Sequence, residues 1–357
     1  MKKVIFVIWH VSGKGGTETV LRTVTQLLQQ KCDQYQPQIY VLGGTEDKTW
    51  LDNIKSDSSP FIKNKFVRAV PYFFWLSSYI KREKPDIVVG LSPMICQMLH
   101  FIKKMNIGNF PIISWMHFSL NANHMKKEWL LKANHHFAIS TGIKDQLEKL
   151  GISDSKIHTI YNPVQRINET VPRPSEETVF LYIGRITFEG QKRLKDLLSA
   201  LAMIKGRWRL EVIGDGEDIS LCKHYAEQLS INQQIIWHGW QQDPWLIVSE
   251  ATALVLTSSY EGFGMVLAEA ISRGIYCVSS DCEVGPNDII EPGINGILYD
   301  VGELNVLQRI LQDIVNGKAL PEQERMKKTL ERFYLENYKD NFISALNTVV
   351  NSYRYQN

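Results

Sequence analysis

Short apolar runs alternate with helical patterns along almost the whole chain of 357 residues, and this alternation limits the fold more than any other feature. The runs are rich in β-branched residues and lack a polar face, so they predict strands that are buried on both sides. They cover residues 4–8, 39–42, 87–89, 112–115, 136–139, 179–183, 210–213, 235–237, 253–256 and 276–279. In the second half, helical patterns lie near residues 191–204, 244–250 and 263–272. Together they predict an α/β fold with parallel sheets covered by helices.

A segment with prolines separates the two series of strands. Residues 162–178 contain Pro163, Pro172 and Pro174 with charged side chains and no apolar period. Proline fixes φ and disfavours helix at the preceding residue, so this segment predicts a linker. We therefore expect two doubly wound, Rossmann-like domains, spanning residues 1–165 and 166–335. Apolar spacing near 3.6 over residues 331–353 predicts a final helix, and we expect residues 336–357 to pack back on the N-terminal domain.

The charges are distributed unevenly, although the whole chain carries a net charge of only +2. Residues 1–165 contain 21 basic and 12 acidic side chains, a net charge of +9, and the remainder has a net charge of −7. A basic half suggests an anionic partner such as a phosphorylated glycan, a membrane surface or nucleic acid. A lysine-rich solvated surface explains the same counts. Nucleic acid is the weakest of these partners because the chain has no recognisable nucleic-acid-binding motif.

Cysteine and hydropathy patterns bear on the cellular compartment. The five cysteines are scattered without CxxC spacing, so they predict neither a disulfide framework nor a structural zinc site, and they indicate a reducing cytosol. The N-terminus has only about six apolar residues before His10, too few for a signal peptide. No run reaches the ~18 apolar residues that span a bilayer. We expect a cytoplasmic protein, with any membrane contact being peripheral.

Metal-ligand patterns are missing from the sequence. His124, His135 and His136 have no carboxylate partner at the spacing of metal ligands, and the chain contains no Asp-x-Asp. A diphosphate clamped by a divalent ion usually depends on such carboxylates. We therefore expect neither a metal ion nor another cofactor.

A glycine-rich stretch follows the first predicted strand. Gly13, Gly15 and Gly16 permit close approach of the main chain to a ligand. Thr17 and Glu18 can begin a helix whose free N–H groups favour a phosphate. Ligands of doubly wound sheets bind at such carboxyl ends of strands. The spacing fits neither GxGxxG nor a Walker loop, so a tight turn without a ligand is the other interpretation.

Cations follow the first strand of the second half. Arg185 comes directly after the strand predicted at residues 179–183, and Gln191 and Lys192 are expected to open the next helix. An arginine can bind two oxygens of a diphosphate while a lysine adds a point charge. The alternative is a surface ion pair between Arg185 and Glu189.

The most specific pattern is a pair of glutamates around the start of a predicted helix. A strand that ends near Leu256 leads into TSSYEGFGMVLAEA, and the helix is expected to begin at about Gly264. Glu269, on the second turn, can accept both hydroxyls of a ribose, and Glu261 can bind hydroxyls of a nucleotide-linked hexose. Free N–H groups of residues 264–266 would face the same ligand. The alternative is a capping role for Glu261 and a solvated surface position for Glu269.

His117 follows the strand predicted at residues 112–115, again at a carboxyl end. A single histidine in such a place is more often a hydrogen-bonded structural residue than a catalytic one. Its expected position opposite the loops of the second domain makes His117 a candidate for catalysis.

Aromatic and basic residues are interleaved between Phe61 and Lys84. This pattern predicts either a surface for anionic lipid or a phosphorylated acceptor, or a helix with core aromatics and a solvated charged face. The residues concerned are Phe66, Tyr72, Phe73, Phe74, Trp75 and Tyr79 with Lys63, Lys65, Arg68, Lys81, Arg82 and Lys84.

Taken together, these residues resemble family 4 of the retaining glycosyltransferases, whose GT-B architecture has two Rossmann-like domains facing a cleft. The resemblance covers nearly the whole chain. Longer stretches at residues 115–120, 188–193, 195–198 and 239–245 are similar to the lipopolysaccharide 1,6-galactosyltransferase group. The matching motifs are Gly15-Gly16-Thr17-Glu18, His117, Ile139-Ser140, Tyr161-Asn162-Pro163, Gly184-Arg185 with Lys192, and Glu261 with Glu269.

The resemblance implies that residues 1–165 form the acceptor-binding domain and residues 166–335 the nucleotide-sugar-binding domain. It also implies a role for each matching residue. Arg185 and Lys192 would neutralise the donor diphosphate, and many members have Lys-Gly where this chain has Lys192 and Arg193. Glu261 would hold the transferred sugar, with His117 near its 6-hydroxyl and the acceptor. The remaining residues implied in binding the nucleotide sugar are Gly15, Gly16, Gln191, Trp240, Gln241, Phe263, Gly264, Met265, Val266 and Glu269.

The implied activity is retaining transfer of galactose, glucose or N-acetylglucosamine from a UDP-sugar to a cell-envelope glycan such as lipopolysaccharide core. A protein-linked adhesin glycan, a glycolipid and a capsule repeat are alternative acceptors, and a non-catalytic sugar-nucleotide-binding partner subunit is an alternative function. The family is thought to use same-face attack, in which the departing phosphate oxygen accepts the proton of the acceptor. The protein then stabilises charge and positions the substrates.

Overall fold

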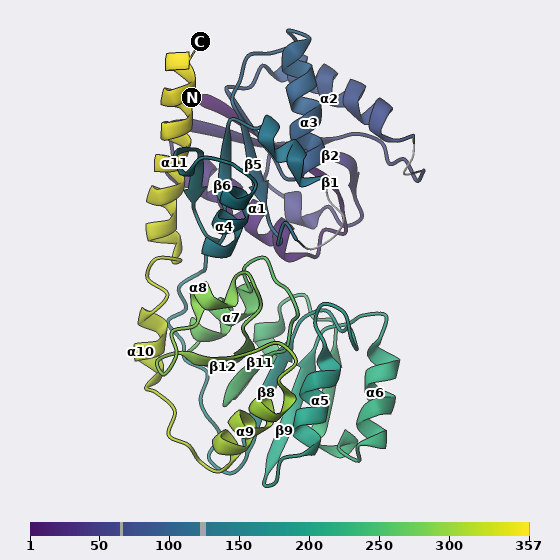
Figure 1. Ribbon diagram of the computed structural model, residues 1–357, viewed down its shortest axis with the longest axis vertical. Helices are drawn as coiled ribbons and strands as arrows, with labels where there is room; N and C mark the ends of the chain where they lie inside the picture. Colours follow the sequence, from purple (N-terminus) through teal and green to yellow (C-terminus); the bar gives the residue numbers. More distant parts are fainter. Residues whose placement is uncertain (65–66, 122–125, 357) are drawn as a thin grey trace. The chain divides into compact units, whose positions relative to one another are not determined.

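The computed structural model describes residues 1–64, 67–121 and 126–356, and it divides into two compact units (Figure 1). The first unit contains Met1–Pro163 and Glu336–Asn357, and the second contains Val164–Leu335. The chain leaves the first unit inside the proline-containing segment that was predicted to be a linker. It returns just after the start of its last helix.

A parallel sheet of seven strands forms the centre of the first unit, in the order β3-β2-β1-β4-β5-β6-β7. The apolar middle of β1, residues 4–7, is completely buried, as expected for a strand covered on both faces. The strands are β1 (Lys2–Val11), β2 (Tyr35–Thr45), β3 (Ser56–Ser58), β4 (Ile87–Gly90), β5 (Ile112–Met116), β6 (His135–Ala138) and β7 (Ile157–Thr159).

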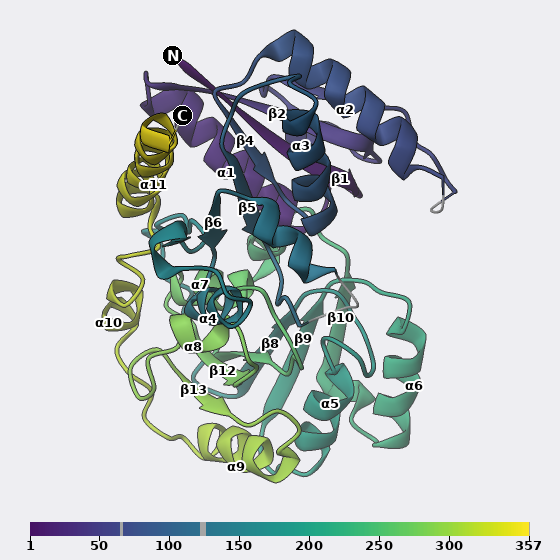
Figure 2. The same ribbon diagram turned by 45° about the horizontal axis from the view of Figure 1, so that its top comes forward.

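Helices cover both faces of this sheet. Figures 1 and 2 both draw α2 and α3 on the side of the sheet away from α11. Serine side chains begin two of the helices: the Ser92 hydroxyl accepts a hydrogen bond from Ile95 N, and the Ser140 hydroxyl accepts one from Ile143 N. The helices of the unit are α1 (Gly16–Lys31), α2 (Ala69–Glu83), α3 (Pro93–Lys104), α4 (Thr141–Lys149) and α11 (Leu335–Gln356).

The last helix of the chain, α11, packs against the sheet of the first unit. The ring of Phe342 lies 5.8 Å from the ring of Trp115 and 5.4 Å from that of Phe137. The Tyr35 hydroxyl donates to Asn347 Oδ1 at 2.7 Å. These contacts bury aromatic side chains of β5 and β6, so the end of the chain completes the core of the unit in which the chain begins.

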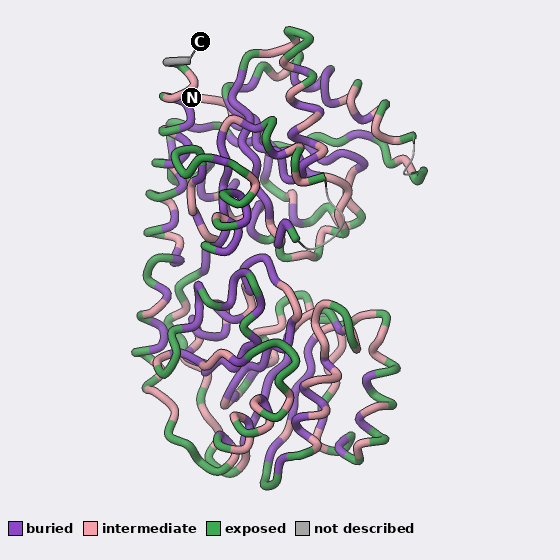
Figure 3. Tube along the Cα trace, viewed as in Figure 1, coloured by how far each residue is buried: buried purple, intermediate pink, exposed green. Residues whose placement is uncertain are grey.

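The second unit contains a parallel sheet of six strands, in the order β10-β9-β8-β11-β12-β13. The segments of β8, β9, β11 and β12 are almost wholly buried, and Figure 3 shows the buried part of the trace in the middle of the unit. The strands are β8 (Thr178–Ile183), β9 (Trp208–Ile213), β10 (Ile235–Gly239), β11 (Ala253–Leu256), β12 (Tyr276–Ser280) and β13 (Gly296–Tyr299). The helices are α5 (Leu194–Ala202), α6 (Ile219–Gln228), α7 (Met265–Ile271), α8 (Pro286–Ile289), α9 (Leu304–Val315) and α10 (Gln323–Lys328). The predicted α/β fold with two doubly wound parallel sheets is confirmed.

Two helix predictions in the second unit are wrong in detail. The helix expected over residues 244–250 is a short 3-10 turn, Pro244–Ile247. Its Leu246 is 83% exposed, so the segment has no buried apolar stripe to support a longer helix. The helix expected from residue 191 begins only at Leu194, because Arg193 has a left-handed conformation with φ of 49°. Gln191 and Lys192 therefore lie in the loop before α5.

None of the helices among the described residues is long and apolar enough to cross a bilayer.

Candidate functional site

The glycine loop after β1 is closed by its own glutamate. The N–H groups of Gly13 and Gly15 donate to Glu18 Oε1 at 3.0 and 3.2 Å. Glu18 is buried and lies in the first turn of α1, where a carboxylate is favoured by the helix dipole. Two N–H groups of the glycine loop are thus already used within the loop.

Gly13 and Gly16 differ in whether the surrounding chain leaves room for a side chain. Gly13 has φ of +87°, and a Cβ there would lie 2.4 Å from the Asp47 carbonyl oxygen, so the fold itself needs glycine. At Gly16 φ is not positive, and an added Cβ would meet nothing within 4 Å. The chain's own packing does not explain glycine at position 16, and the space beside it is open to a ligand.

His117 lies directly after β5 and is mostly enclosed. Its ring centroid is 4.5 Å from that of Trp115, and its buried Nε2 has no hydrogen-bond partner among the described residues. Burial lowers the pKa of His117 to about 3, so the side chain is neutral at pH 7. His117 can therefore take part in a neutral hydrogen bond but does not add a positive charge.

The other histidines named from the sequence have structural partners or lie outside the described residues. His135 Nδ1 lies 3.1 Å from His158 Nε2, and His136 Nδ1 lies 2.7 Å from the Ser114 hydroxyl. His124 lies outside the described residues. Within the part of the chain that the structure describes, no group of three or more His, Cys, Asp or Glu side chains could hold a metal ion.

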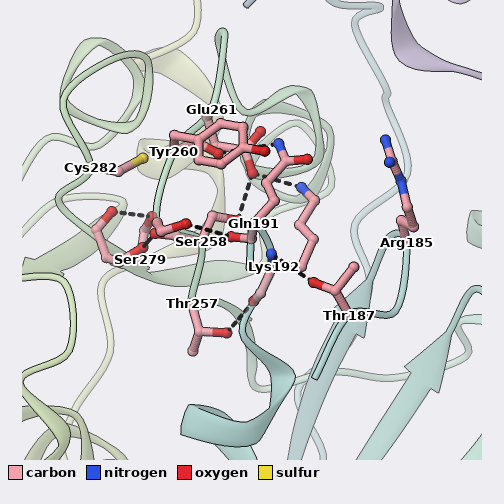
Figure 4. Close-up of polar contacts among 12 residues, drawn as sticks. Arg185, Thr187, Gln191, Lys192, Thr257, Ser258, Tyr260, Glu261, Ser279 and Cys282 are labelled. Carbon is pink, nitrogen blue, oxygen red and sulfur yellow. Dashed lines mark hydrogen bonds and ion pairs between the residues drawn. The ribbon is translucent and has the colours of Figure 1, made fainter. Parts of the chain in front are cut away.

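Lys192 and Glu261 form the centre of the site in the second unit (Figure 4). Lys192 Nζ donates to Glu261 Oε1 at 2.6 Å, and both side chains are almost buried, with exposures of 14% and 10%. The buried Ser258 hydroxyl donates to the same oxygen at 2.6 Å. Glu261 Oε1 therefore has two donors, and Oε2 is available to accept from a substrate hydroxyl.

Main-chain contacts hold these two residues together although they are 69 positions apart. Gln191 Nε2 donates to the Tyr260 carbonyl at 3.2 Å, and Ser259 N donates to the Gln191 carbonyl at 2.8 Å. The Thr257 hydroxyl donates to the Lys192 carbonyl at 2.9 Å. The loop after β8 and the loop after β11 are joined along their length, so the Lys192–Glu261 pair has a fixed geometry.

Arg185 is placed by glycines but is not held by a counterion. A Cβ on Gly214 would lie 1.9 Å from the Gly184 carbonyl oxygen. The main chains of the loops after β8 and β9 are therefore in contact at the residue before Arg185. The Arg185 side chain is exposed and has no hydrogen bond or ion pair with any described residue. The alternative ion pair with Glu189 is wrong, because Glu189 pairs with Lys195 at 2.7 Å. In Figure 4 the Arg185 side chain lies beside the Lys192–Glu261 pair without a dashed line to it.

Glu269 lies on α7 in contact with two residues that the sequence analysis gave no role. Trp245 Nε1 donates to Glu269 Oε2 at 3.1 Å, and the Arg273 guanidinium lies over the Trp245 ring at 4.3 Å. Glu269 is half-buried and accepts this hydrogen bond, so the alternative of a solvated surface position is wrong. Burial also raises the pKa of Glu269 above its usual value. The spacing of four residues between Glu269 and Arg273 is the sequence signal that could have predicted this cluster.

The remaining predicted residues surround the same strand ends. Trp240 is 49% exposed after β10, and Gln241 Nε2 donates to the His238 carbonyl at 3.1 Å. Phe263 is buried with its ring 5.4 Å from that of Phe333, so its side chain belongs to the core and does not reach a ligand. Gly264 precedes α7 with φ of 90°, and Met265 and Val266 form its first turn.

Comparison with known proteins identifies the class. Residues 14–166 match the model of Glycosyltransferase Family 4, and residues 164–332 match that of Glycosyl transferases group 1. The chain is 40% identical to the lipopolysaccharide 1,6-galactosyltransferase of Escherichia coli K12 over 346 residues, 95% of this chain and 96% of that protein. The chain belongs to glycosyltransferase family 4. This family 4 enzyme is also 40% identical to the lipopolysaccharide 1,6-galactosyltransferase of Salmonella typhimurium LT2, over 96% of its own length and 98% of the relative's.

Solved structures agree with this classification. The family 4 enzyme resembles the apo form of the lipopolysaccharide outer core galactosyltransferase WaaB with a TM-score of 0.88 and 39% identity, over 97% of this chain and 99% of WaaB. Anabaena HepE in complex with UDP and glucose has a TM-score of 0.82 at 17% identity, over 98% and 100% of the two chains. The second likeness supports the GT-B fold alone.

Proposed function

We propose that this enzyme is a retaining galactosyltransferase that transfers galactose from UDP-galactose to the core of lipopolysaccharide. The observation that carries the proposal is the 40% identity, over nearly the full length of both chains, to the 1,6-galactosyltransferase of Escherichia coli. A relative at this distance supports transfer of a hexose to a lipopolysaccharide acceptor. Selection of galactose over glucose depends on how the loops of the site hydrogen-bond the one hydroxyl at which these two sugars differ.

The second unit supplies the groups that we assign to the donor. Glu261 uses one N–H of the Lys192 ammonium, which leaves two donors for the diphosphate. Arg185, without a counterion among the described residues, adds a second positive charge. The main task of such a site is to stabilise the negative charge that develops on the departing diphosphate in the transition state. Its oxygen then accepts the proton of the attacking hydroxyl on the same face of the sugar.

The other residues position the two ends of the donor. We assign Glu269 to the ribose hydroxyls and the exposed ring of Trp240, with Gln241, to the uracil. Glu261 Oε2 and the main chain of residues 263–266 would hold the hexose. From the first unit, we assign Gly15 and Gly16 to the diphosphate and the neutral His117 to a hydrogen bond with the 6-hydroxyl of the sugar. No metal ion takes part in this scheme.

A donor and acceptor screen tests the proposed activity. We expect the purified enzyme to transfer hexose to lipopolysaccharide that lacks its outer sugars. It should use UDP-galactose at least about tenfold more efficiently than UDP-glucose or UDP-N-acetylglucosamine, the discrimination that a hydroxyl-reading site provides. Product formation is followed by mass spectrometry, with and without EDTA. A preference for another donor, or loss of activity in EDTA, contradicts the proposal.

We further propose that the enzyme rests on an anionic membrane through the first half of α2. Val70 and Phe74 lie four positions apart on α2 and are 63% and 62% exposed, and Val67, just before the helix, is 55% exposed. Arg68 directly precedes α2, and Lys81 lies in its last turn. Exposed apolar residues flanked by cations are typical of helices that lie in the interface of a bilayer. The aromatic residues of the segment divide between the two predicted roles, since Tyr72 and Tyr79 belong to the core. Lys65 and Phe66 lie outside the described residues.

Vesicle binding tests this membrane proposal. We expect the enzyme to sediment with vesicles of phosphatidylglycerol at low salt but not with vesicles of phosphatidylcholine, because the attraction is partly electrostatic. A Val70→Ser/Phe74→Ser variant should bind several-fold less. Leu246→Ser, which removes a side chain that is 83% exposed in the second unit, serves as the control. Equal binding of both variants would refute the assigned surface.

A further inference from the structure

Trp245 has no role in the proposed scheme, yet it joins the short turn after β10 to α7. Its indole Nε1 donates to Glu269 Oε2 at 3.1 Å. Its main-chain N–H donates to Asp243 Oδ1 at 3.0 Å, which fixes the start of the turn Pro244–Ile247. Every residue of this turn is at least partly exposed, so packing in the core does not hold it. The half-buried indole is therefore the group that ties the turn to the Glu269 carboxylate.

Arg273 fixes the same contact from the end of α7. Its guanidinium lies over the Trp245 ring at 4.3 Å, and its Nη1 donates to the Glu269 main-chain carbonyl at 2.9 Å. The Ser272 hydroxyl donates to that carbonyl as well, at 2.8 Å. A cation over an indole face favours one orientation of the ring. Main chain, guanidinium and indole thus hold Glu269 at both of its ends, so its carboxylate has a defined position.

The indole contact also decides what Glu269 can offer to a ligand. An indole N–H is only a donor, and a carboxylate has about four acceptor positions, so accepting from Trp245 leaves room for two hydroxyl groups. Burial raises the pKa of Glu269, whereas the Trp245 N–H and the Arg273 guanidinium lower it and the Asp243 carboxylate raises it. Trp245 and Arg273 therefore favour the ionised carboxylate, which is the form that accepts from both hydroxyls.

We infer that Trp245 is a positioning residue for the nucleotide, whose indole N–H orients the Glu269 carboxylate toward the ribose hydroxyls of the donor. The inference rests on the proposed function, in which Glu269 binds the ribose, and it adds a residue that acts through Glu269. The ribose is bound in the same way before and during transfer of the hexose. Loss of the contact therefore raises KM for the donor and leaves kcat unchanged.

The test compares UDP with 2′-deoxy-UDP, which lacks one of the two ribose hydroxyls, by isothermal titration calorimetry. We expect the unaltered enzyme to bind UDP at least about tenfold more tightly, the order of one hydrogen bond to a charged group. In Trp245→Phe this preference should fall to about threefold or less, because nothing orients the Glu269 carboxylate. KM for UDP-galactose should rise about tenfold, with kcat within about twofold of its usual value.

A merely structural role of Trp245 leads to a different result. Loosening of the turn would weaken UDP and 2′-deoxy-UDP equally, and an unchanged preference overturns the inference. Tighter binding of UDP by Trp245→Phe also overturns it, since the indole would then compete with the ribose for Glu269. Trp237→Phe is the matched control. It removes an indole on β10 that also lies under a cation, Lys223 at 5.7 Å, and it should keep the full preference for UDP.

A double variant tests whether Trp245 acts through Glu269. In a Glu269→Gln background, Trp245→Phe should change the Kd of UDP by less than about twofold, because the two changes remove one shared interaction. A further tenfold loss would show that the indole contacts the nucleotide itself, and would overturn the inference. Arg273→Met, which removes the cation over the ring, should lower the preference for UDP in the same direction and serves as the test if Trp245→Phe does not fold. Failure of the unaltered enzyme to bind UDP would instead refute the proposed function.

Discussion

Replacing Arg185 with alanine should lower kcat about 100-fold or more while leaving Tm nearly unchanged. The loss follows from removing one preorganised charge donor from the departing diphosphate, an effect on the order of 10²–10³ in other enzymes. Stability should not change because the Arg185 side chain is exposed and makes no hydrogen bond or ion pair with a described residue, and the Arg185 carbonyl that accepts from the Tyr182 hydroxyl is kept in the variant. Steady-state transfer from UDP-galactose and a thermal melt measure the two quantities.

Lys192→Ala should show the same loss of turnover together with a loss of stability. Removing Lys192 leaves the nearly buried Glu261 carboxylate with only the Ser258 hydroxyl as a hydrogen-bond donor. Breaking such a buried ion pair lowers the free energy of unfolding. Lys195→Ala is the matched control for both variants. It deletes an exposed cation on α5 whose partner is Glu189, and its turnover should stay within about twofold of the unaltered enzyme. Near-normal turnover of both Arg185→Ala and Lys192→Ala would refute their assigned role.

The second large effect is expected for Glu261→Gln. The amide keeps the size of the side chain but loses the negative charge that pairs with Lys192. It is also a weaker hydrogen-bond acceptor for the hydroxyls of the hexose. We expect kcat/KM for UDP-galactose to fall about 100-fold, the order expected when a charged hydrogen bond to the substrate and the position of a charge donor are lost together. The inhibition constant of UDP should change only a few-fold, because UDP has no hexose to be held.

This contrast between donor and product separates two roles of Glu261. Equal weakening of UDP and UDP-galactose would show that the carboxylate acts only through the diphosphate cation and not on the sugar. Glu189→Gln is the control, since it neutralises an exposed carboxylate in the loop after β8, the loop that also carries Lys192. A Glu261→Gln enzyme with full activity would remove Glu261 from the site altogether.

Strand positions were the most predictable part of the fold. Strands that are buried on both faces must be apolar throughout, so β1, β8 and β11 are visible as continuous runs. By contrast, β3 consists of three exposed polar residues, Ser56–Ser58, and its pairing with β2 depends on tertiary contacts alone. The prediction of a helix at residues 244–250 was wrong for a similar reason. The exposure of Leu246 depends on the tertiary fold and cannot be read from the local sequence.

The site was predictable in its residue types but not in its pairings. The glycine loop, the cations and the two glutamates are short motifs at strand ends, where function is expected. Whether Lys192 meets Glu261 is decided by the contact between the loops after β8 and β11, which local sequence does not encode. In the same way, the hydrogen bonds from Gly13 N and Gly15 N to Glu18, and the contact of Trp245 with Glu269, depend on how the loops fold.

The return of α11 to the first unit affects the order in which the protein can be made. During translation the strands β5 and β6 leave the ribosome long before residues 336–357. The rings of Trp115 and Phe137 therefore lack their contact with Phe342 until the second unit has been synthesised. Chains that expose apolar surface for this long are prone to aggregate. A variant truncated before residue 336 should therefore be insoluble, even though every residue assigned to the donor is still present.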